Sequence, residues 1–138
     1  MKKINRLQSF QYAFAGIWYT LTTQRNAQIH VIIALFIVIL GLVLHLSFIE
    51  WAILALTTGF VIAAEMLNTA TEAAMDMATT DFHPQVKIVK DVAAGAVLTA
   101  AITAVVVGIF ILGPPLLDLT LATRITASTT LAQPSFAP

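Results

Sequence analysis

The chain has 138 residues, of which 59% are hydrophobic and only 10% are charged, so too few charges are available to cover a water-soluble domain of this length. Its formal net charge is zero, which gives no argument for a nucleic-acid partner. It has no cysteine, which excludes disulfides, thiolate metal sites and cysteine nucleophiles. We therefore expect one all-α domain embedded in a membrane, so that lipid surrounds much of its surface.

Residues 4–25 predict an amphipathic helix that lies in the membrane interface rather than crossing it. Because Asn5, Gln8 and Gln11 interrupt its apolar pattern, we do not expect a cleaved signal peptide. A helix packed on the rest of the protein is a compatible alternative. The apolar residues recur at spacings of three and four, as on one helix face: Ile4, Leu7, Phe10, Phe14, Ile17, Trp18 and Leu21.

Three apolar segments follow, and each is long enough for a transmembrane helix, which needs about 20 residues. We expect the spans at residues 29–47, 50–77 and 88–112. The third span carries small residues at every fourth position, a pattern that lets helices approach closely. These small residues are Ala96, Ala100, Ala104 and Gly108.

The end of the chain changes character after Gly113-Pro114-Pro115. Residues 114–138 are rich in Thr, Ala, Ser and Pro, and this composition predicts a tail with little fixed structure. A short helix around residues 116–124 is the alternative. The chain is thus expected to consist of a membrane-embedded domain over residues 1–113 and a C-terminal tail.

The basic residues predict the orientation of the three spans. Four precede the first span and two lie between the second and third, so six of seven fall on one side of the membrane. The positive-inside rule places the N-terminus and the second loop in the cytoplasm. We expect a multi-pass protein of the plasma or inner membrane, with Arg124 alone outside. The six residues are Lys2, Lys3, Arg6, Arg25, Lys87 and Lys90.

One face of the second span is polar. Glu65, Asn68, Glu72 and Asp76 stand at i, i+3, i+7 and i+11, which places them within about 80° of arc on a helix. An acidic group inside a span costs on the order of 3 kcal/mol and is a functional candidate. The alternative, a helix end that becomes polar as it leaves the membrane, applies most to Asp76.

The loop after this span brings basic and acidic residues next to the polar face. Carboxylates hold Mg²⁺, while Lys and His neutralise phosphate oxygens, so the loop suits a magnesium nucleotide at the membrane surface. The sequence has no Walker-type loop and no kinase glycine-rich loop, so such a site needs a different architecture. Alternatively, the lysines only set topology, and His83 is a loop residue before proline. The loop residues are Asp81, His83, Lys87, Lys90 and Asp91.

The run from Glu65 to Asp76, followed by His83 and Lys90-Asp91, resembles the prokaryotic diacylglycerol kinase/undecaprenol kinase family. Residues 9–16, 25–30 and 93–97 are also similar to that family, and the resemblance covers roughly residues 5–112. The segment before the first span is more similar to the undecaprenol kinase branch.

The resemblance implies a homotrimer with active sites shared between subunits near the cytoplasmic membrane surface. Such an enzyme transfers the γ-phosphate of Mg-ATP to the hydroxyl of a membrane lipid, either diacylglycerol or undecaprenol. Glu65 matches the general base and also a substrate-binding residue, together with Asn68 and Ala94. Glu72 matches a metal ligand. The positions that match nucleotide contacts are Tyr12, Glu72, Asp81, His83, Lys90 and Asp91.

Gln24 departs from the family pattern, which commonly has a metal-binding glutamate at this position. Its amide oxygen still provides a ligand for Mg²⁺, but the site loses one negative charge. This departure keeps open a non-catalytic assembly or regulatory role. A small proton or ion conduit lined by Glu65, Asn68 and Glu72 is a further alternative, although the polar face stops at Glu65 and the outer half of the span supplies no relay.

Overall fold

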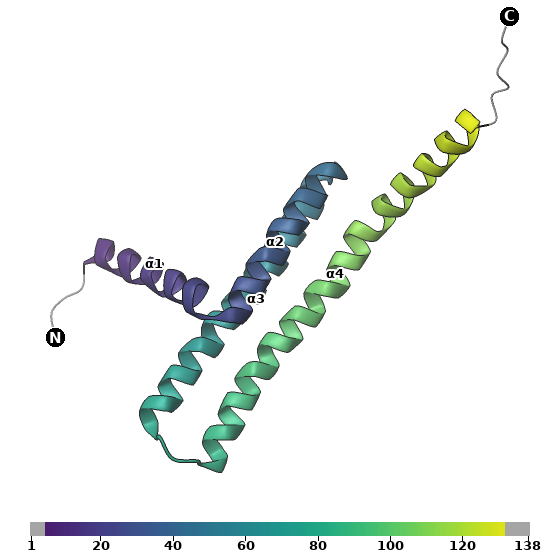
Figure 1. Cartoon of the computed structure of the whole chain (residues 1–138). Coiled ribbons are helices and arrows are strands. Elements are labelled where there is room, and N and C mark those ends of the chain that lie inside the picture. Colours follow the sequence, from purple (N-terminus) through teal and green to yellow (C-terminus); the bar gives the residue numbers. More distant parts are fainter. Residues whose placement is uncertain (1–4, 132–138) are drawn as a thin grey trace, which may run out of the picture.

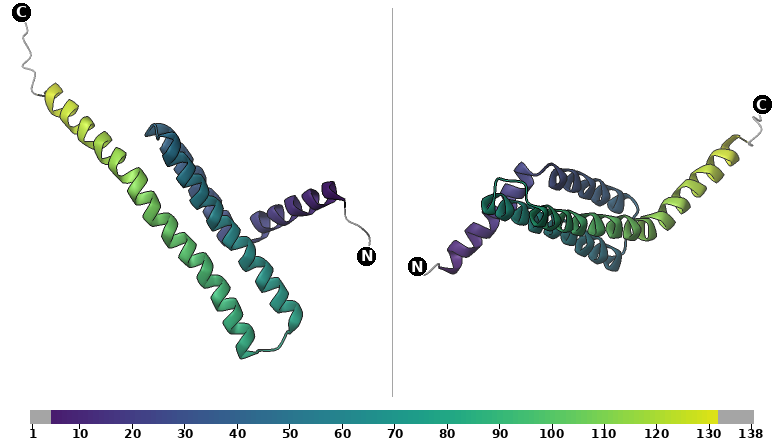
Figure 2. Two further views of the ribbon diagram at one scale, coloured as in Figure 1. Left: turned by 180° about the vertical axis from the view of Figure 1, so that it is seen from behind. Right: turned by 90° about the horizontal axis from the view of Figure 1, so that it is seen from below.

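The computed structural model describes residues 5–131, and within that range all regular structure is helical. The elements are α1 (Arg6–Thr23), α2 (Arg25–Val43), α3 (Phe48–Ala78) and α4 (Pro84–Leu131). Figure 1 shows α2, α3 and α4 running alongside one another, while α1 projects to the side. The most extensive packing joins α3 to α4, and α2 packs on α3. Figure 2 shows the same arrangement from behind and from below. The prediction of an all-α fold is confirmed.

Within residues 5–131, three helices are long and apolar enough to cross a membrane: Arg25–Val43, Phe48–Ala78 and Pro84–Leu121. Many of their large apolar side chains point outward, including Ile32 on α2, Leu56 on α3 and Phe110 on α4. A water-soluble protein does not expose apolar surface on this scale, whereas lipid is a favourable solvent for it. The prediction of a membrane protein with three spans is confirmed.

Asn5 is the N-cap of helix α1, and its backbone N–H donates a 3.1 Å hydrogen bond to Gln8 Oε1 in a capping box. The helix lies within the predicted range of residues 4–25 and leads through Gln24 into α2. Its apolar stripe, which includes Phe10, Phe14 and Trp18, is exposed and unpartnered in this chain. Its position in the membrane interface stays a prediction, and Lys2, Lys3 and Ile4 lie outside the described residues.

A tight turn joins α2 to α3. His45 has a φ of 54°, and the Leu46 N–H donates to the Gly41 carbonyl at 3.1 Å, as in a Schellman motif. Ser47 then caps α3, because its backbone N–H donates to Glu50 Oε2 at 2.7 Å and its hydroxyl accepts from the Glu50 N–H at 3.4 Å. Both caps give hydrogen-bond partners to backbone groups at the helix ends, so a short connection is enough to join α2 to α3.

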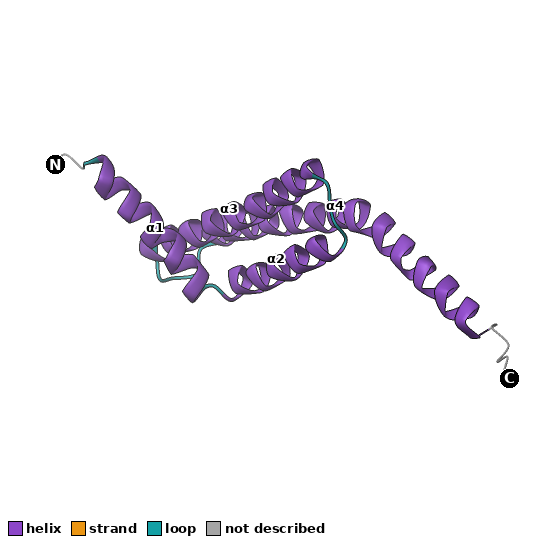
Figure 3. Cartoon of the chain, turned by 90° about the horizontal axis from the view of Figure 1, so that it is seen from above, coloured by secondary structure: helices purple, strands orange, loops and turns teal. Residues whose placement is uncertain are grey.

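Helix α4 is longer than expected. The sequence predicted that the third span ends at residue 112 and gives way to a tail with little fixed structure, but α4 continues through Pro114 and Pro115 to Leu131. Proline inside a helix removes a backbone donor and clashes with the preceding turn, which bends the helix, and the leucines and alanines that follow favour its continuation. Figure 3 shows this last part of α4 running at an angle to the part that packs on α3. Residues 132–138 of the predicted tail lie outside the described residues.

The small residues of α4 face the bundle over most of the predicted stripe. Ala100 is buried and Ala104 and Gly108 are half-buried, whereas Ala96 is exposed. Because these residues lack bulky side chains, the backbones of α3 and α4 approach closely along this face.

Gly41 is the position at which the turn between α2 and α3 should be most sensitive to substitution. A Cβ there would lie 2.8 Å from the Trp51 ring, whereas a Cβ at Gly59 would meet nothing within 4 Å. Both Gly41→Ala and Gly59→Ala raise helix propensity, so the difference between their free energies of unfolding reports the effect on packing. We expect Gly41→Ala to be less stable than Gly59→Ala by about 1–3 kcal/mol, measured by unfolding in detergent. Equal stabilities would contradict this packing.

Candidate active site

A pocket of about 360 Å³ lies between α2, α3 and α4, and we call it the Glu65 pocket. Its polar lining comes from Asn26 and His30 on α2 and from Glu65, Asn68 and Glu72 on α3. Its α4 wall is apolar and is formed by Ala94, Val97, Leu98 and Ala101. The structure therefore brings the two predicted carboxylates and Asn68 together with the predicted Ala94.

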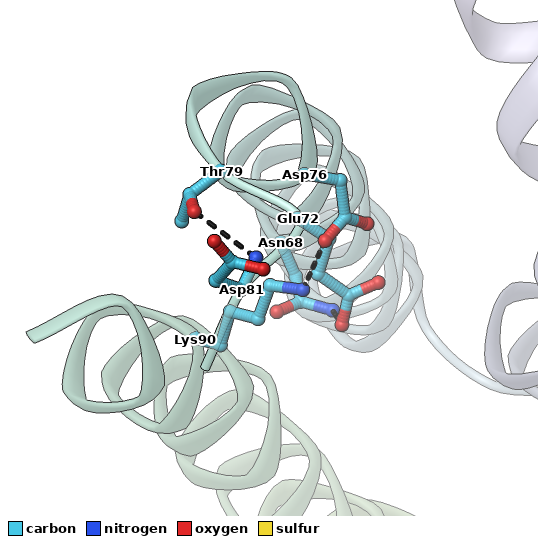
Figure 4. A network of polar contacts seen from close by, with 6 residues as sticks. All are labelled: Asn68, Glu72, Asp76, Thr79, Asp81 and Lys90. Carbon is cyan, nitrogen blue, oxygen red and sulfur yellow. Dashed lines mark hydrogen bonds and ion pairs between the residues drawn. The ribbon is translucent and has the colours of Figure 1, made fainter. Parts of the chain in front are cut away.

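Glu65 is almost completely buried, with 2% of its surface exposed, and Asn68 is 8% exposed. Asn68 Nδ2 donates a 3.1 Å hydrogen bond to Glu72 Oε1, which orients both side chains (Figure 4). Glu65 Oε1 and Asn68 Oδ1 are buried and make no hydrogen bond within residues 5–131. Glu65 Oε1 has His30 Nε2 3.4 Å away, so Asn68 Oδ1 is the oxygen without a partner in the described chain. A buried polar atom without a partner costs roughly 1–3 kcal/mol, which makes the pocket beside Asn68 Oδ1 a candidate ligand site.

The oxygen atoms of this pocket fit a magnesium ion only in part. Mg²⁺ prefers oxygen ligands, and Glu72 with the free Oδ1 of Asn68 supplies two of the right kind. Over the part of the chain that the structure describes, no group of three or more His, Asp or Glu residues is placed to hold a metal. Mg²⁺ usually keeps several waters and phosphate oxygens, so this donor set suits a metal that arrives with a nucleotide.

A second pocket of about 480 Å³ lies where α3 and α4 meet their connecting loop, and we call it the loop pocket. It collects all of the polar loop residues that the sequence singled out, together with Asp76. The polar side chains that line it include Asp76, Asp81, His83, Lys87, Lys90 and Asp91.

Both lysines of the loop pocket are paired with aspartates. Lys90 Nζ contacts Asp76 Oδ1 and so links α4 to α3 (Figure 4), and Lys87 Nζ contacts Asp91 Oδ2 within α4. The Asp81 N–H donates to Thr79 Oγ1 at 3.1 Å. These contacts hold two ammonium groups at the end of the bundle.

His83 has a structural part in the loop pocket. Its Nδ1 accepts a 3.2 Å hydrogen bond from the Gln85 N–H, and Pro84 occupies the first position of α4. The imidazole therefore caps the helix in the way that a polar side chain does at an N-terminus. The alternative interpretation of His83 as a loop residue before proline fits this contact, which leaves Nε2 uninvolved in the cap.

The polar face of α3 is divided between the two pockets. Glu65, Asn68 and Glu72 line the Glu65 pocket, and Asp76, one turn further on, lines the loop pocket. Eleven residues separate Glu65 from Asp76, which is about 16 Å along a helix axis. The polar residues along α3 therefore range from a deeply buried one, Glu65, to an exposed one, Asp76.

Two predicted site residues line neither pocket. Tyr12 is 62% exposed on α1, and Gln24 lies at the junction of α1 and α2, where its Nε2 is 3.4 Å from Thr23 Oγ1. Conversely, the site prediction missed Asn26 and His30. The available signal was His30 itself, a polar residue near the start of an apolar span.

The ion pair between Asp76 and Lys90 should contribute little to stability, because both side chains are substantially exposed (67% and 35%). In a double-mutant cycle with Asp76→Asn and Lys90→Gln, we expect a coupling of about 1 kcal/mol or less that declines with added salt. A second double-mutant cycle, on the Lys87–Asp91 pair within α4, serves as the comparison. A coupling well above 2 kcal/mol by detergent unfolding would show that the pair is a main support of the loop, in conflict with its exposure.

Comparison with known proteins agrees with this geometry. The family model for prokaryotic diacylglycerol kinase matches residues 11–112. A diacylglycerol kinase of Synechocystis sp. is 48% identical over 116 residues, which are 83% of this chain and 66% of that protein. An undecaprenol kinase of Bacillus subtilis is 42% identical over 115 residues, 83% of this chain and 94% of that protein. A diacylglycerol kinase of Helicobacter pylori is 32% identical over 104 residues, 70% of this chain and 81% of that protein.

The matched range contains α2, α3 and the part of α4 that packs on α3, and with them both pockets. The chain spans slightly less than two thirds of the Synechocystis protein and nearly all of the Bacillus one. The family match covers more than half of the chain, and the Bacillus similarity covers almost the whole of a relative. The chain therefore belongs to the prokaryotic diacylglycerol kinase family of membrane lipid kinases.

Proposed function

We propose that this protein transfers the γ-phosphate of Mg-ATP to the hydroxyl of diacylglycerol or undecaprenol at the cytoplasmic membrane face. The observation that supports this most is Glu65, a carboxyl group 2% exposed in a pocket between membrane spans, with the Asn68–Glu72 pair beside it. The family membership and the names of the relatives supply the reaction class and the two candidate lipids.

Glu65 acts as the general base. A lipid headgroup hydroxyl in the Glu65 pocket reaches Oε1, the carboxyl oxygen that makes no hydrogen bond within the described chain. The hydroxyl oxygen forms a bond to the γ-phosphorus, the bond between that phosphorus and the β,γ-bridging oxygen breaks, and the hydroxyl proton passes to Glu65. ADP and the phosphorylated lipid are the products. Asn68 and Ala94 flank the lipid headgroup in the same pocket.

The nucleotide binds between Glu72 and the loop pocket. Glu72 and Asn68, with Gln24, would hold Mg²⁺, which neutralises phosphate charge when it is bound. Lys90 exchanges Asp76 for a phosphate oxygen, since an ammonium group binds either anion. Asp81, His83 and Asp91 complete the nucleotide contacts. Positioning and charge neutralisation carry most of the rate, as is usual in phosphoryl transfer.

The working enzyme is a homotrimer in which a neighbouring subunit completes each site. This assembly is supported by Tyr12 and Gln24, which line neither pocket within one chain, and by the large apolar surfaces that α1 to α4 leave exposed. The orientation follows the basic residues, with the loop pocket in the cytoplasm. Nucleotide then reaches the loop pocket from water while the lipid reaches Glu65 from the inner leaflet.

Replacement of Glu65 should abolish the activity while the protein stays folded and assembled. We expect Glu65→Gln to lower kcat by about 10²–10⁴-fold, because the amide cannot accept the hydroxyl proton. The measurement is transfer of labelled γ-phosphate onto diacylglycerol and undecaprenol in parallel, with oligomer size measured by chromatography. Glu50→Gln is the matched control, since glutamine preserves the capping box with Ser47 at the other end of α3. Retained transfer in Glu65→Gln would remove this residue as the base.

Restoring the charge at Gln24 should strengthen metal binding. A carboxylate there adds one negative charge to the proposed magnesium site, so Gln24→Glu should lower the Mg²⁺ concentration for half-maximal activity about fivefold, equivalent to about 1 kcal/mol. Gln28→Glu adds the same charge one turn further along α2 and serves as the control. If both variants lower the half-maximal Mg²⁺ concentration equally, the effect is one of general electrostatics. If neither variant changes it, Gln24 is not a ligand of the metal.

A further inference from the structure

Among the described residues, His30 on α2 is the one basic group that lines the Glu65 pocket, and the proposed phosphoryl transfer does not use it. Its Nε2 lies 3.4 Å from Glu65 Oε1. The two side chains differ in their access to water, since 21% of His30 is exposed and only 2% of Glu65. A small rotation of either side chain brings this distance into the range of a hydrogen bond.

The proposed reaction leaves one proton on Glu65 in every turnover, and the carboxylate must be restored before the next. The other groups around Glu65 do not accept that proton. Asn68 carries a neutral amide that donates to Glu72, and the Thr69 hydroxyl donates to the Glu65 carbonyl at 2.8 Å. The α4 wall of the pocket is apolar. Glu72 stands seven residues along the helix, about 10 Å in the axial direction.

We propose that His30 is the proton outlet of Glu65, an inference that rests on the proposed function. With its own proton on Nδ1, His30 accepts the proton of Glu65 at Nε2, so that an O–H bond breaks, an N–H bond forms and the carboxylate is regenerated. The imidazolium then releases a proton to water at the opening of the pocket. The imidazole ring is suited to this because Nε2 accepts one proton while Nδ1 carries another. His30 acts through Glu65 after the chemical step and touches neither substrate in this scheme.

This proposal predicts a difference between the first turnover and those that follow. His30→Gln keeps a polar side chain beside Glu65 but cannot carry the proton. We expect one equivalent of phosphorylated lipid per site to form at close to the wild-type rate, followed by a steady-state rate reduced by about 10²-fold. KM for ATP and for the lipid should stay within about twofold of wild type, since neither substrate is bound by His30 in this scheme.

The experiment is rapid-quench measurement of phosphorylated lipid formed by the purified full-length protein in detergent. His45→Asn is the matched control, because it removes a histidine outside the pocket and asparagine tolerates the positive φ of that position. His30→Gly with added imidazole is the second test, and imidazole should restore the steady-state rate in proportion to its concentration.

Three results would overturn the proposal. The first is a steady-state rate for His30→Gln within about twofold of wild type, well short of the usual acid–base effect. The second is an equal slowing of first and later turnovers, which indicates that His30 only orients Glu65. The third is a His30→Gly protein that retains the first turnover and is not restored by imidazole. Wild-type protein without transfer to either lipid would instead contradict the proposed function, so the two failures are distinguishable.

Discussion

A carboxyl group held between membrane-spanning helices is the feature on which the site depends. Glu65 is 2% exposed, and such a group is costly in lipid unless protein surrounds it. The shielding comes from three helices: α3 carries the residue, α2 places His30 against it, and α4 closes the pocket with residues as small as Ala94. Bulky side chains on α4 would fill the space that the pocket occupies. The close packing of α3 and α4 is therefore a requirement of the site as well as of the fold.

The length of α3 connects two environments. Its 31 residues extend about 46 Å, more than the roughly 30 Å of a bilayer core, whereas the 19 residues of α2 extend about 28 Å. The excess lies at the end that carries Asp76, where the loop pocket is exposed. In the proposed reaction, the lipid hydroxyl and the water-soluble nucleotide therefore reach different turns of the same helix. That arrangement suits a reaction between a membrane-bound and a soluble substrate.

The loop pocket is held together by contacts that a ligand is able to replace. Lys90 contacts Asp76 and Lys87 contacts Asp91, and both pairs are exposed. Exposed pairs of this kind contribute at most about 1 kcal/mol, so a phosphate group displaces a carboxylate at little cost. The Glu65 pocket differs in this respect. Within the described residues, Asn68 Oδ1 is buried there without a hydrogen-bond partner, and Glu65 Oε1 has only the 3.4 Å contact with His30 Nε2, so a ligand in this pocket displaces no carboxylate–ammonium pair.

The sequence by itself determined the helices, the three spans and the residues of the polar face. These features follow from local properties, which do not depend on how a helix packs. The properties are composition, apolar periodicity and the spacing of Glu65, Asn68 and Glu72. The same local reasoning failed at Pro114, where a typical stop signal sits inside α4. Only the tertiary structure decided that His30 faces Glu65, that Asp76 belongs with Lys90 in a separate pocket, and that Tyr12 and Gln24 line neither pocket. These outcomes depend on the rotation and depth of one helix against another, and a periodic pattern specifies a face without specifying which neighbour meets it.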